Sequence, residues 1–259
     1  MEFMKKLSLF VLVVLALFAL TACGDDSKKA SKDTKPEKVY KVGVDATYPP
    51  FEWQVNGEYK GIDIDLIRAI AKKEGFKIEI QSMDFKGIIP ALQSKQLDIS
   101  IAGMSITDER KKIIDFSDPY FDAGLSIVVK GDNNSIKSAS DLSGKKIAVK
   151  KGTSGAQYAV DNFTSKGATI IQFDSSPAMF EEVKTGRADA LIEDFPVISY
   201  AIADQKLPLK VVGDRLNADQ YGIGVVKGTN SDLMKKINKG LAALKADGSY
   251  QDIVDKYLE

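Results

Sequence analysis

The sequence predicts an α/β fold of two similar lobes with a ligand cleft between them. Stretches with the alternating pattern of a strand are followed by stretches with helical periodicity, and this series runs through the chain twice. A strand, a helix and a second strand in succession form a parallel pair, so each series predicts a largely parallel sheet. One further strand and two helices follow the second series, and they have no third lobe to belong to.

The first series begins with a predicted strand at residues 40–44, Tyr-Lys-Val-Gly-Val. Helical periodicity follows over residues 64–73 and stops at Gly75, because glycine commonly ends a helix. A strand, a helix and a strand are then predicted at residues 76–80, 87–92 and 97–101. This order predicts one complete lobe.

The second series repeats the order and contains an internal echo of the first. A helix end, a turn, an aspartate and a hydrophobic strand follow one another at residues 91–101 and again at residues 182–192, with Asp98 and Asp189 in corresponding places. The predicted strands are residues 146–149, 169–173 and 190–192, and the predicted helices are residues 155–163 and 178–184. The repetition predicts a second lobe of similar build.

The C-terminal part contains a predicted strand at residues 221–226 and helices at residues 232–246 and 249–257. The simplest arrangement returns these elements to the first lobe, so that two connections, near residues 120–125 and 218–222, join the lobes as a hinge. We therefore expect a first lobe of residues 38–122 and 220–259 and a second lobe of residues 123–219.

The N-terminus has the pattern of a targeting segment. Lys5 and Lys6 precede an apolar run over residues 7–20, which is short for a membrane span and typical of a signal-peptide core. The single cysteine, Cys23, follows Leu-Thr-Ala, which resembles a bacterial lipobox, in which the cysteine is acylated. We predict a lipoprotein signal peptide over residues 1–22, a lipid on Cys23, and a flexible polar tether over residues 23–37.

Composition excludes several classes of function. The 259-residue chain has a formal net charge of +0, so nothing favours a nucleic-acid partner. It has no histidine and one cysteine, which excludes disulfides within the chain, Cys/His metal sites and a Ser-His-Asp triad. We predict no metal and no cofactor.

The segment between the strand at residues 97–101 and the next helix predicts a carboxylate site. Gly103 allows close approach of a ligand to the main chain, Ser105 adds a hydroxyl, and Arg110 carries a planar set of donors suited to a carboxylate. Thr107 is typical of a helix N-cap. The spacing alone is equally consistent with an ordinary turn whose arginine pairs with a surface acid.

Five phrases carry a specific resemblance: Tyr-Pro-Pro-Phe-Glu at 48–52, Gly-Ile-Asp-Ile-Asp-Leu at 61–66, Met-Asp-Phe-Lys-Gly-Ile-Ile-Pro-Ala-Leu at 83–92, Ser-Ile-Thr-Asp-Glu-Arg-Lys-Lys at 105–112 and Ile-Asp-Phe-Ser-Asp-Pro-Tyr-Phe at 114–121. The chain from about residue 40 onward resembles the solute-binding proteins of polar amino-acid ABC transporters, family 3, and glutamine-binding proteins most closely. The resemblance implies a periplasmic-binding-protein-like fold of type II, in which two lobes joined by a two-strand hinge close over one amino acid.

The resemblance also implies roles for the charged residues. Arg110, with Gly103 and Ser105, would bind the α-carboxylate of the ligand, and Asp194 would bind the α-ammonium. A zwitterion that leaves water needs both charges paired, so one arginine and one aspartate are the minimum.

Four more residues complete the expected contacts with the ligand's main chain and aliphatic part. Thr153 and Ser154 precede a predicted helix and can add donors at its positive end. Tyr48 and Phe85 would sandwich the aliphatic part of the ligand, although core packing accounts for most aromatic residues in any chain.

The choice of ligand depends on Asp45, Lys150 and Glu193, which align with the side-chain pocket. Two acids and one base suit a neutral amide, so we predict glutamine. If Lys150 instead neutralises Glu193 at the rim, a basic ligand such as arginine or lysine is free to pair with Asp45.

Two other functions stay open at this point. The fold family includes cyclohexadienyl dehydratases, in which a carboxyl group in the same cleft is the general acid, and Glu193 is the candidate here. A receptor partner in trans would make the protein a sensor. We predict a monomeric, non-enzymatic binding protein that is lipid-anchored at the outer face of the cell membrane, of the Gram-positive type, and that delivers its ligand to ABC permease subunits.

Overall fold

The computed structural model describes residues 38–258. The predicted signal peptide, the lipidated Cys23 and the tether lie outside these residues. The chain divides into two units, Met1–Glu37 and Lys38–Glu259, and the second contains every element described below. Within the described part, no helix has the length and apolar character needed to cross a membrane.

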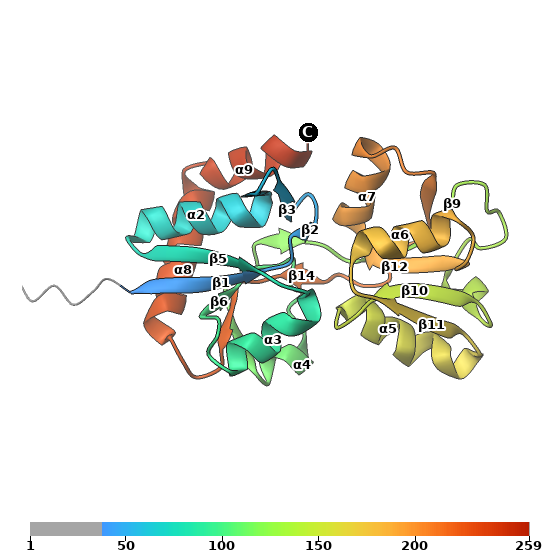
Figure 1. Ribbon diagram of the computed structural model, residues 1–259, viewed down its shortest axis with the longest axis horizontal. Coiled ribbons are helices and arrows are strands. Elements are labelled where there is room, and N and C mark those ends of the chain that lie inside the picture. The colour runs from blue at the N-terminus through green and yellow to red at the C-terminus, as the bar shows by residue number, and fades with distance from the viewer. Residues whose placement is uncertain (1–37, 259) are drawn as a thin grey trace, which may run out of the picture. The chain divides into compact units, whose positions relative to one another are not determined.

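The first sheet has five strands in the order β5-β1-β6-β15-β7. The central strand pairs are parallel, whereas β15 runs antiparallel to both of its neighbours. Figure 1 shows α2 and α9 above this sheet, in the orientation drawn, and α3 with the short α4 below it. The strands are β1 (Val39–Val44), β5 (Lys77–Ser82), β6 (Ile99–Ser100), β7 (Ile114–Phe116) and β15 (Gly224–Val226), and the helices are α2 (Ile62–Glu74), α3 (Phe85–Gln93), α4 (Asp108–Lys111), α8 (Ser231–Ala246) and α9 (Ser249–Leu258).

The second sheet also has five strands, in the order β11-β10-β12-β9-β13. It has parallel pairs at β10 and antiparallel pairs at β9, so it repeats the plan of the first sheet. The strands are β9 (Leu125–Lys130), β10 (Lys146–Lys150), β11 (Thr169–Phe173), β12 (Ala190–Asp194) and β13 (Leu209–Val212), and the helices are α5 (Ser154–Phe163), α6 (Ser176–Lys184) and α7 (Phe195–Asp204), with 3-10 turns at Ala139–Leu142 and Thr164–Lys166. The predicted two-lobed α/β fold is confirmed, and neither sheet closes into a barrel.

The two repeated segments, at residues 91–101 and 182–192, make the same hydrogen bond in each lobe. Asp98 accepts a hydrogen bond from the backbone N–H of Lys41 in β1 at 3.0 Å, and Asp189 accepts one from the backbone N–H of Lys146 in β10 at 2.8 Å. In both lobes the aspartate accepts from a backbone N–H near the start of the parallel strand beside it, and so it fixes where the next strand enters the sheet.

The two predicted connections pair with each other. β8 (Phe121–Asp122) lies antiparallel to β14 (Gln220–Tyr221), and Ala123 N donates to Asp219 O at 2.8 Å. A small sheet of β2 (Thr47–Tyr48), β3 (Glu52–Val55) and β4 (Glu58–Lys60) lies beside the first lobe's helix α2. We keep the lobe boundaries given above as a proposal.

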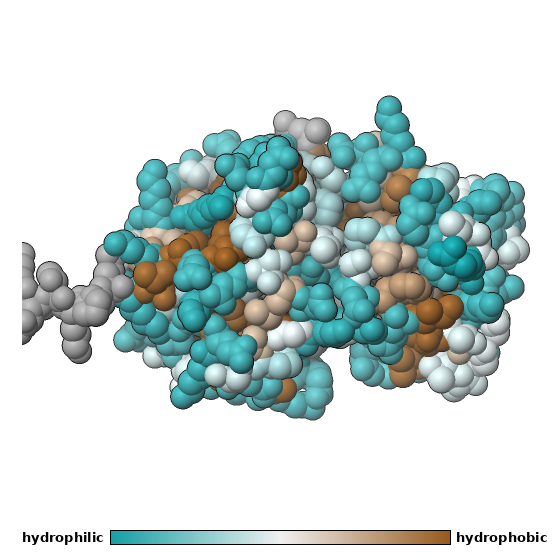
Figure 2. All heavy atoms as spheres, viewed as in Figure 1, coloured by the Kyte–Doolittle hydropathy of each residue, from teal (hydrophilic) through white to brown (hydrophobic). Residues whose placement is uncertain are grey.

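Hydrophobic side chains fill the space between each sheet and its longer helices, because these helices turn one apolar face inward. Helix α2, for example, buries Ile62, Ile64, Leu66, Ile67 and Ile70. Figure 2 shows that most of the visible surface is hydrophilic, with hydrophobic residues in separate patches. The same view shows a hollow between the two lobes on its lower edge.

Candidate ligand-binding site

The predicted site residues gather where the two lobes face each other. In an open α/β sheet, ligands bind beyond the carboxyl ends of the strands, and these residues lie at or just after such ends. They come from four strand ends and one helix start: Asp45 and Tyr48 after β1; Gly103, Ser105 and Arg110 after β6; Lys150, Thr153 and Ser154 at and after β10; Glu193 and Asp194 at the end of β12; and Phe85 at the start of α3.

Arg110 is buried and bridges the lobes through backbone oxygens. Its Nη1 donates to Ser105 O at 2.8 Å, and its Nη2 donates to Gly152 O in the other lobe at 3.0 Å. Thr107 is the N-cap of α4, as predicted, and accepts from Arg110 N. Among residues 38–258 no carboxylate forms an ion pair with Arg110, so the alternative in which it pairs with a surface acid does not hold there, and a carboxylate ligand fits the remaining charge.

Helix α5 begins at the same place and adds a second source of anion binding. Thr153 is its N-cap: the hydroxyl accepts from Ala156 N at 3.1 Å and donates to Lys150 O at 2.8 Å. Ser154 Oγ lies 3.1 Å from Ser105 Oγ across the cleft. Because the first N–H groups of a helix have no partner within it, this end of α5 favours an anion beside Arg110.

The role of Gly103 in the site differs from the predicted one. Its N–H donates to Asp63 Oδ2 at 2.8 Å, so it is not free for a carboxylate, and only the carbonyl oxygen is left to a ligand as an acceptor. The residue must still be glycine, because φ is +52° and a Cβ would lie 2.7 Å from Tyr48 Cε1.

Asp194 is buried against two tyrosines. The hydroxyls of Tyr48, at 2.6 Å, and Tyr221 both lie on its Oδ2. Burial, and next the charge of Glu193, raise the pKa of Asp194 to about 7, although the hydrogen bonds from the two hydroxyls lower it. An ammonium group at the free oxygen would favour the ionised form.

Glu193 is held by donors of the protein itself. It accepts from Ser176 Oγ at 2.6 Å, from the backbone N–H of Asp194 at 2.9 Å and from Tyr48, whose hydroxyl lies 2.9 Å away. Burial raises the pKa of Glu193, while Ser176 and the nearby Lys150 lower it. Its orientation is therefore set before any ligand arrives.

Lys150 pairs with Asp45 and not with Glu193. Its Nζ lies 2.6 Å from Asp45 Oδ2, and the two side chains are only 2% and 4% exposed. The alternative that placed Lys150 against Glu193 at the rim is therefore wrong in its geometry. The ammonium lies 4.4 Å from the centroid of the Tyr48 ring and 5.6 Å from that of Phe85, so it reaches into the space between the two predicted sandwiching rings.

The lobes are in contact on both sides of this site. On one side Asp174 of the second lobe accepts from Lys86 of α3 at 2.6 Å and from Lys151 at 3.0 Å. Elsewhere Trp53 of β3 lies 6.3 Å from Tyr200 of α7 between ring centroids. The structure thus describes the lobes in a closed arrangement.

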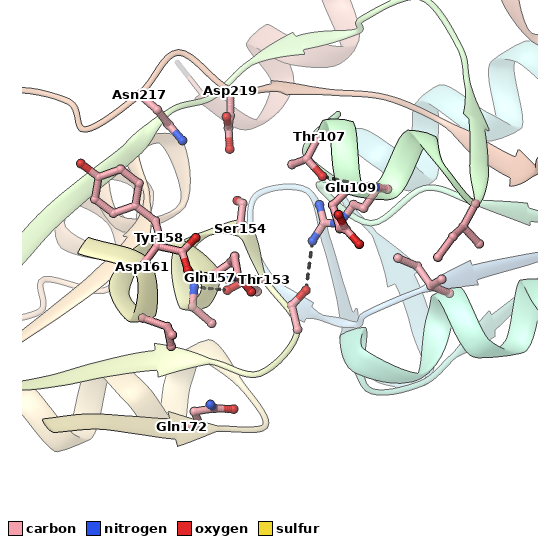
Figure 3. A pocket seen from close by; sticks show the side chains of 16 residues that line it. Thr107, Glu109, Thr153, Ser154, Gln157, Tyr158, Asp161, Gln172, Asn217 and Asp219 are labelled. Atoms are coloured by element: carbon pink, nitrogen blue, oxygen red, sulfur yellow. Dashed lines mark hydrogen bonds between the residues drawn. The ribbon is translucent and has the colours of Figure 1, made fainter. Parts of the chain in front are cut away.

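Two cavities follow from this closure. An enclosed one of about 10 Å³ is barely the size of one water, so an amino acid enters only when the lobes separate or side chains move. Nine predicted residues line it: Tyr48, Phe85, Gly103, Ser105, Arg110, Lys150, Thr153, Ser154 and Asp194. A groove of about 520 Å³ continues outward from Arg110, between Thr107 and Glu109 of one lobe and Ser154 and Gln157 of the other (Figure 3).

Three residues of the site were not predicted from the sequence. Tyr221 comes from the hinge strand β14, Ser176 from the start of α6, and Asp63 from the first turn of α2. Each acts on a predicted residue elsewhere in the chain, and no local motif marks Tyr221 or Ser176. The Gly-Ile-Asp-Ile-Asp phrase at residues 61–65 was the available signal for Asp63.

Comparison with known proteins places the chain among binding proteins. Residues 40–259 match the family model of bacterial extracellular solute-binding proteins, family 3. The ABC transporter glutamine-binding protein GlnH of Bacillus subtilis (strain 168) is 35% identical, over 99% of this chain and 98% of its own. Two solved structures, each 48% identical and covering 85% of this chain, are described as an ancestral arginine-binding protein bound to arginine (TM-score 0.80, 98% of that chain) and bound to glutamine (TM-score 0.78, 97% of that chain).

Proposed function

Because the chain belongs to the bacterial extracellular solute-binding proteins of family 3, we propose that it captures glutamine outside the cytoplasm, as a monomer, and delivers it to ABC permease subunits. Family membership supports amino-acid binding for an ABC transporter. The choice among amino acids rests on the charges in the cleft.

Both ends of the amino acid's main chain have partners in the cleft. Arg110, the hydroxyls of Ser105 and Ser154, and the start of α5 can bind the α-carboxylate. Asp194 and the carbonyl of Gly103 can accept from the α-ammonium. This end of the site accepts any L-amino acid and cannot set selectivity.

The proposal that the ligand is glutamine rests on the position of the Lys150 ammonium. It is buried, paired with Asp45, and lies between the rings that would flank the ligand's side chain. A side-chain amide can accept from Lys150 through its carbonyl and donate to a carboxylate through its NH2. A basic ligand would bring a second cation toward Lys150 in a closed, poorly hydrated cleft.

Arginine is the second candidate, and Glu193 favours it. With Lys150 paired to Asp45, Glu193 is a buried carboxylate that forms no ion pair within residues 38–258. A guanidinium that reached Glu193 would compensate this charge. The solved relative that is described both with arginine and with glutamine supports the view that one such cleft can take either ligand.

Replacing Lys150 with glutamine separates the two candidates. The variant keeps hydrogen-bonding capacity and removes the repelling charge, so the preference should move toward arginine by about 1–2 kcal/mol, the scale of one charge-assisted contact. Calorimetry with both ligands on both proteins measures the shift. Lys151→Gln is the matched control, since Lys151 is half-exposed and paired with Asp174 at the surface. The glutamine proposal fails if the wild type already prefers arginine, or if Lys150→Gln weakens both ligands equally.

We also propose how the protein is held outside the cytoplasm. The lipobox-like sequence before Cys23 supports a lipid anchor at the outer face of the membrane. Cys23→Ser should move the protein from the membrane to the soluble fraction of fractionated cells. Retention of the variant on membranes would contradict the anchor.

We propose no catalytic activity. A general acid needs a carboxyl group that presents a proton to its substrate. Glu193 instead accepts from Ser176 and from the backbone N–H of Asp194, shares the Tyr48 hydroxyl with Asp194, and lies close to Lys150. Turnover of prephenate or arogenate by the purified protein would overturn this assignment in favour of a dehydratase.

A further inference from the structure

Two buried carboxyl groups face each other behind the Gly103 segment. Glu52 opens β3 and Asp63 lies in the first turn of α2, and both are 0% exposed. Asp63 Oδ2 accepts from Gly103 N at 2.8 Å and from the Tyr120 hydroxyl at 2.9 Å. Neither Asp63 Oδ1 nor either oxygen of Glu52 receives a hydrogen bond from an N–H or a hydroxyl of the described residues.

A shared proton explains this arrangement. Two ionised carboxylates are both acceptors, so they cannot bond to each other, and their buried oxygens would stay unsatisfied. A proton on Glu52 makes it a donor to Asp63, and the two side chains are close enough for this hydrogen bond. One shared proton then satisfies Asp63 Oδ1 and the protonated oxygen of Glu52.

The surroundings assign the proton to Glu52. Burial, then the charges of Asp63 and Asp45, raise the pKa of Glu52 well above its usual range, and Lys150 opposes this only in part. Burial raises the pKa of Asp63 to about 6, while hydrogen bonds from Glu52, Gly103 and Tyr120 oppose the rise.

Two tyrosines also lie near the pair, and both stay neutral. Burial, then the charges of Asp122 and Asp63, raises the pKa of Tyr250 of α9 to about 12. Burial, then the charges of Asp63 and Glu52, raises the pKa of Tyr120 well above its usual range. Near neutral pH, Glu52 is therefore protonated and Asp63 carries the charge.

We propose that ionised Asp63 is a positioning residue that fixes the Gly103 peptide, and with it the ligand-facing segment 103–105, and that Glu52 holds the proton that makes this possible. The inference rests on the proposed function, because it concerns how the cleft holds the main-chain end of an amino acid. The bond from Gly103 is charge-assisted while Asp63 is ionised, and it becomes an ordinary neutral bond once Asp63 is protonated. Ligand affinity should therefore depend on the protonation of Asp63.

The test compares Asp63→Asn with the wild type by calorimetric titration with glutamine at several pH values. Asparagine can still accept from Gly103 and donate to Glu52, but the bond to Gly103 is neutral at every pH. The Kd of the variant should be about tenfold higher than that of the wild type above pH 7, and the ratio should approach one below about pH 5. The ratio cancels the titration of Asp194, which both proteins share.

Two further variants extend the test. Glu52→Gln supplies a permanent donor to Asp63, so its Kd near pH 7.5 should stay within about threefold of the wild type. Tyr120→Phe removes one donor that favours ionised Asp63, so its Kd should exceed the wild-type value near pH 6 and match it at pH 8. If Asp63→Asn does not fold, the Tyr120→Phe variant still tests whether ligand affinity depends on the ionisation of Asp63.

The outcomes are distinct from those for the proposed function. A Kd ratio for Asp63→Asn that is constant with pH, or close to one above pH 7, overturns the positioning role. A large loss of affinity in Glu52→Gln overturns the assignment of the proton. If the wild type binds another amino acid instead, the same ratios are measured with that ligand, and if it binds none, the proposed function fails and the inference fails with it.

Discussion

Arg110→Ala is expected to weaken the binding of every amino acid by at least about 3 kcal/mol, which is more than a hundredfold in Kd. The guanidinium is buried and pairs with no carboxylate of the described residues, so the α-carboxylate of a ligand would be its charged partner. Without it, a ligand carboxylate enters the closed cleft uncompensated. Calorimetric titration with several amino acids measures the loss.

The fold should survive this substitution. Within residues 38–258 the Arg110 guanidinium donates only to the carbonyls of Ser105 and Gly152, and water can donate to these carbonyls in its place when the lobes are apart. Two controls bracket the effect: Arg110→Lys keeps the charge without the planar set of donors, and Arg68→Ala removes a half-exposed arginine on α2. The carboxylate role is wrong if Arg110→Ala still binds within tenfold of the wild type, a difference of about 1.4 kcal/mol.

Asp194→Asn should also cost about 3–5 kcal/mol in binding, because the ligand's ammonium would lose its buried counter-charge. The pH dependence follows from the pKa of about 7 that burial gives Asp194 in the absence of ligand. An ammonium favours the ionised form and lowers this pKa, so wild-type affinity is full above pH 7 and falls by up to about tenfold per unit as the pH drops below it.

The asparagine variant should bind weakly and lose the pH dependence that comes from residue 194. Titrations from about pH 5 to pH 8 compare it with the wild type and with Asp204→Asn, which removes an exposed carboxylate at the end of α7. A wild-type affinity that does not change below pH 7, or an asparagine variant within tenfold of the wild type, contradicts the ammonium role.

The sequence predicts those parts of the fold that depend on local order. Each strand and helix of the two series has its own periodicity, and the repeated aspartates Asp98 and Asp189 satisfy the neighbouring strands in the same way. The eleven site residues were predicted from the resemblance together with their places, most of which are strand ends, where a parallel sheet presents them together.

The partners of the site residues could not be predicted, because they depend on how distant elements meet. The sequence places Lys150 in one pocket with two acids, Asp45 and Glu193, and only the approach of the lobes pairs it with Asp45. Gly103 was expected to serve the ligand, but the first turn of α2 takes its N–H through Asp63. Tyr221 of the hinge strand β14 contacts Asp194, but its sequence pattern is that of an ordinary buried strand.

The central claim is that this cleft selects glutamine, and thermal unfolding of the purified protein with each of the twenty amino acids tests it most directly. A ligand that binds only the folded protein stabilises it by about 2.7 kcal/mol at a hundredfold excess over Kd, which is roughly 5–10 °C in Tm for a chain of this size. We expect glutamine to give the largest rise, and the Arg110→Ala variant to show none. A larger rise with arginine or lysine, or no rise with any amino acid, would contradict the account.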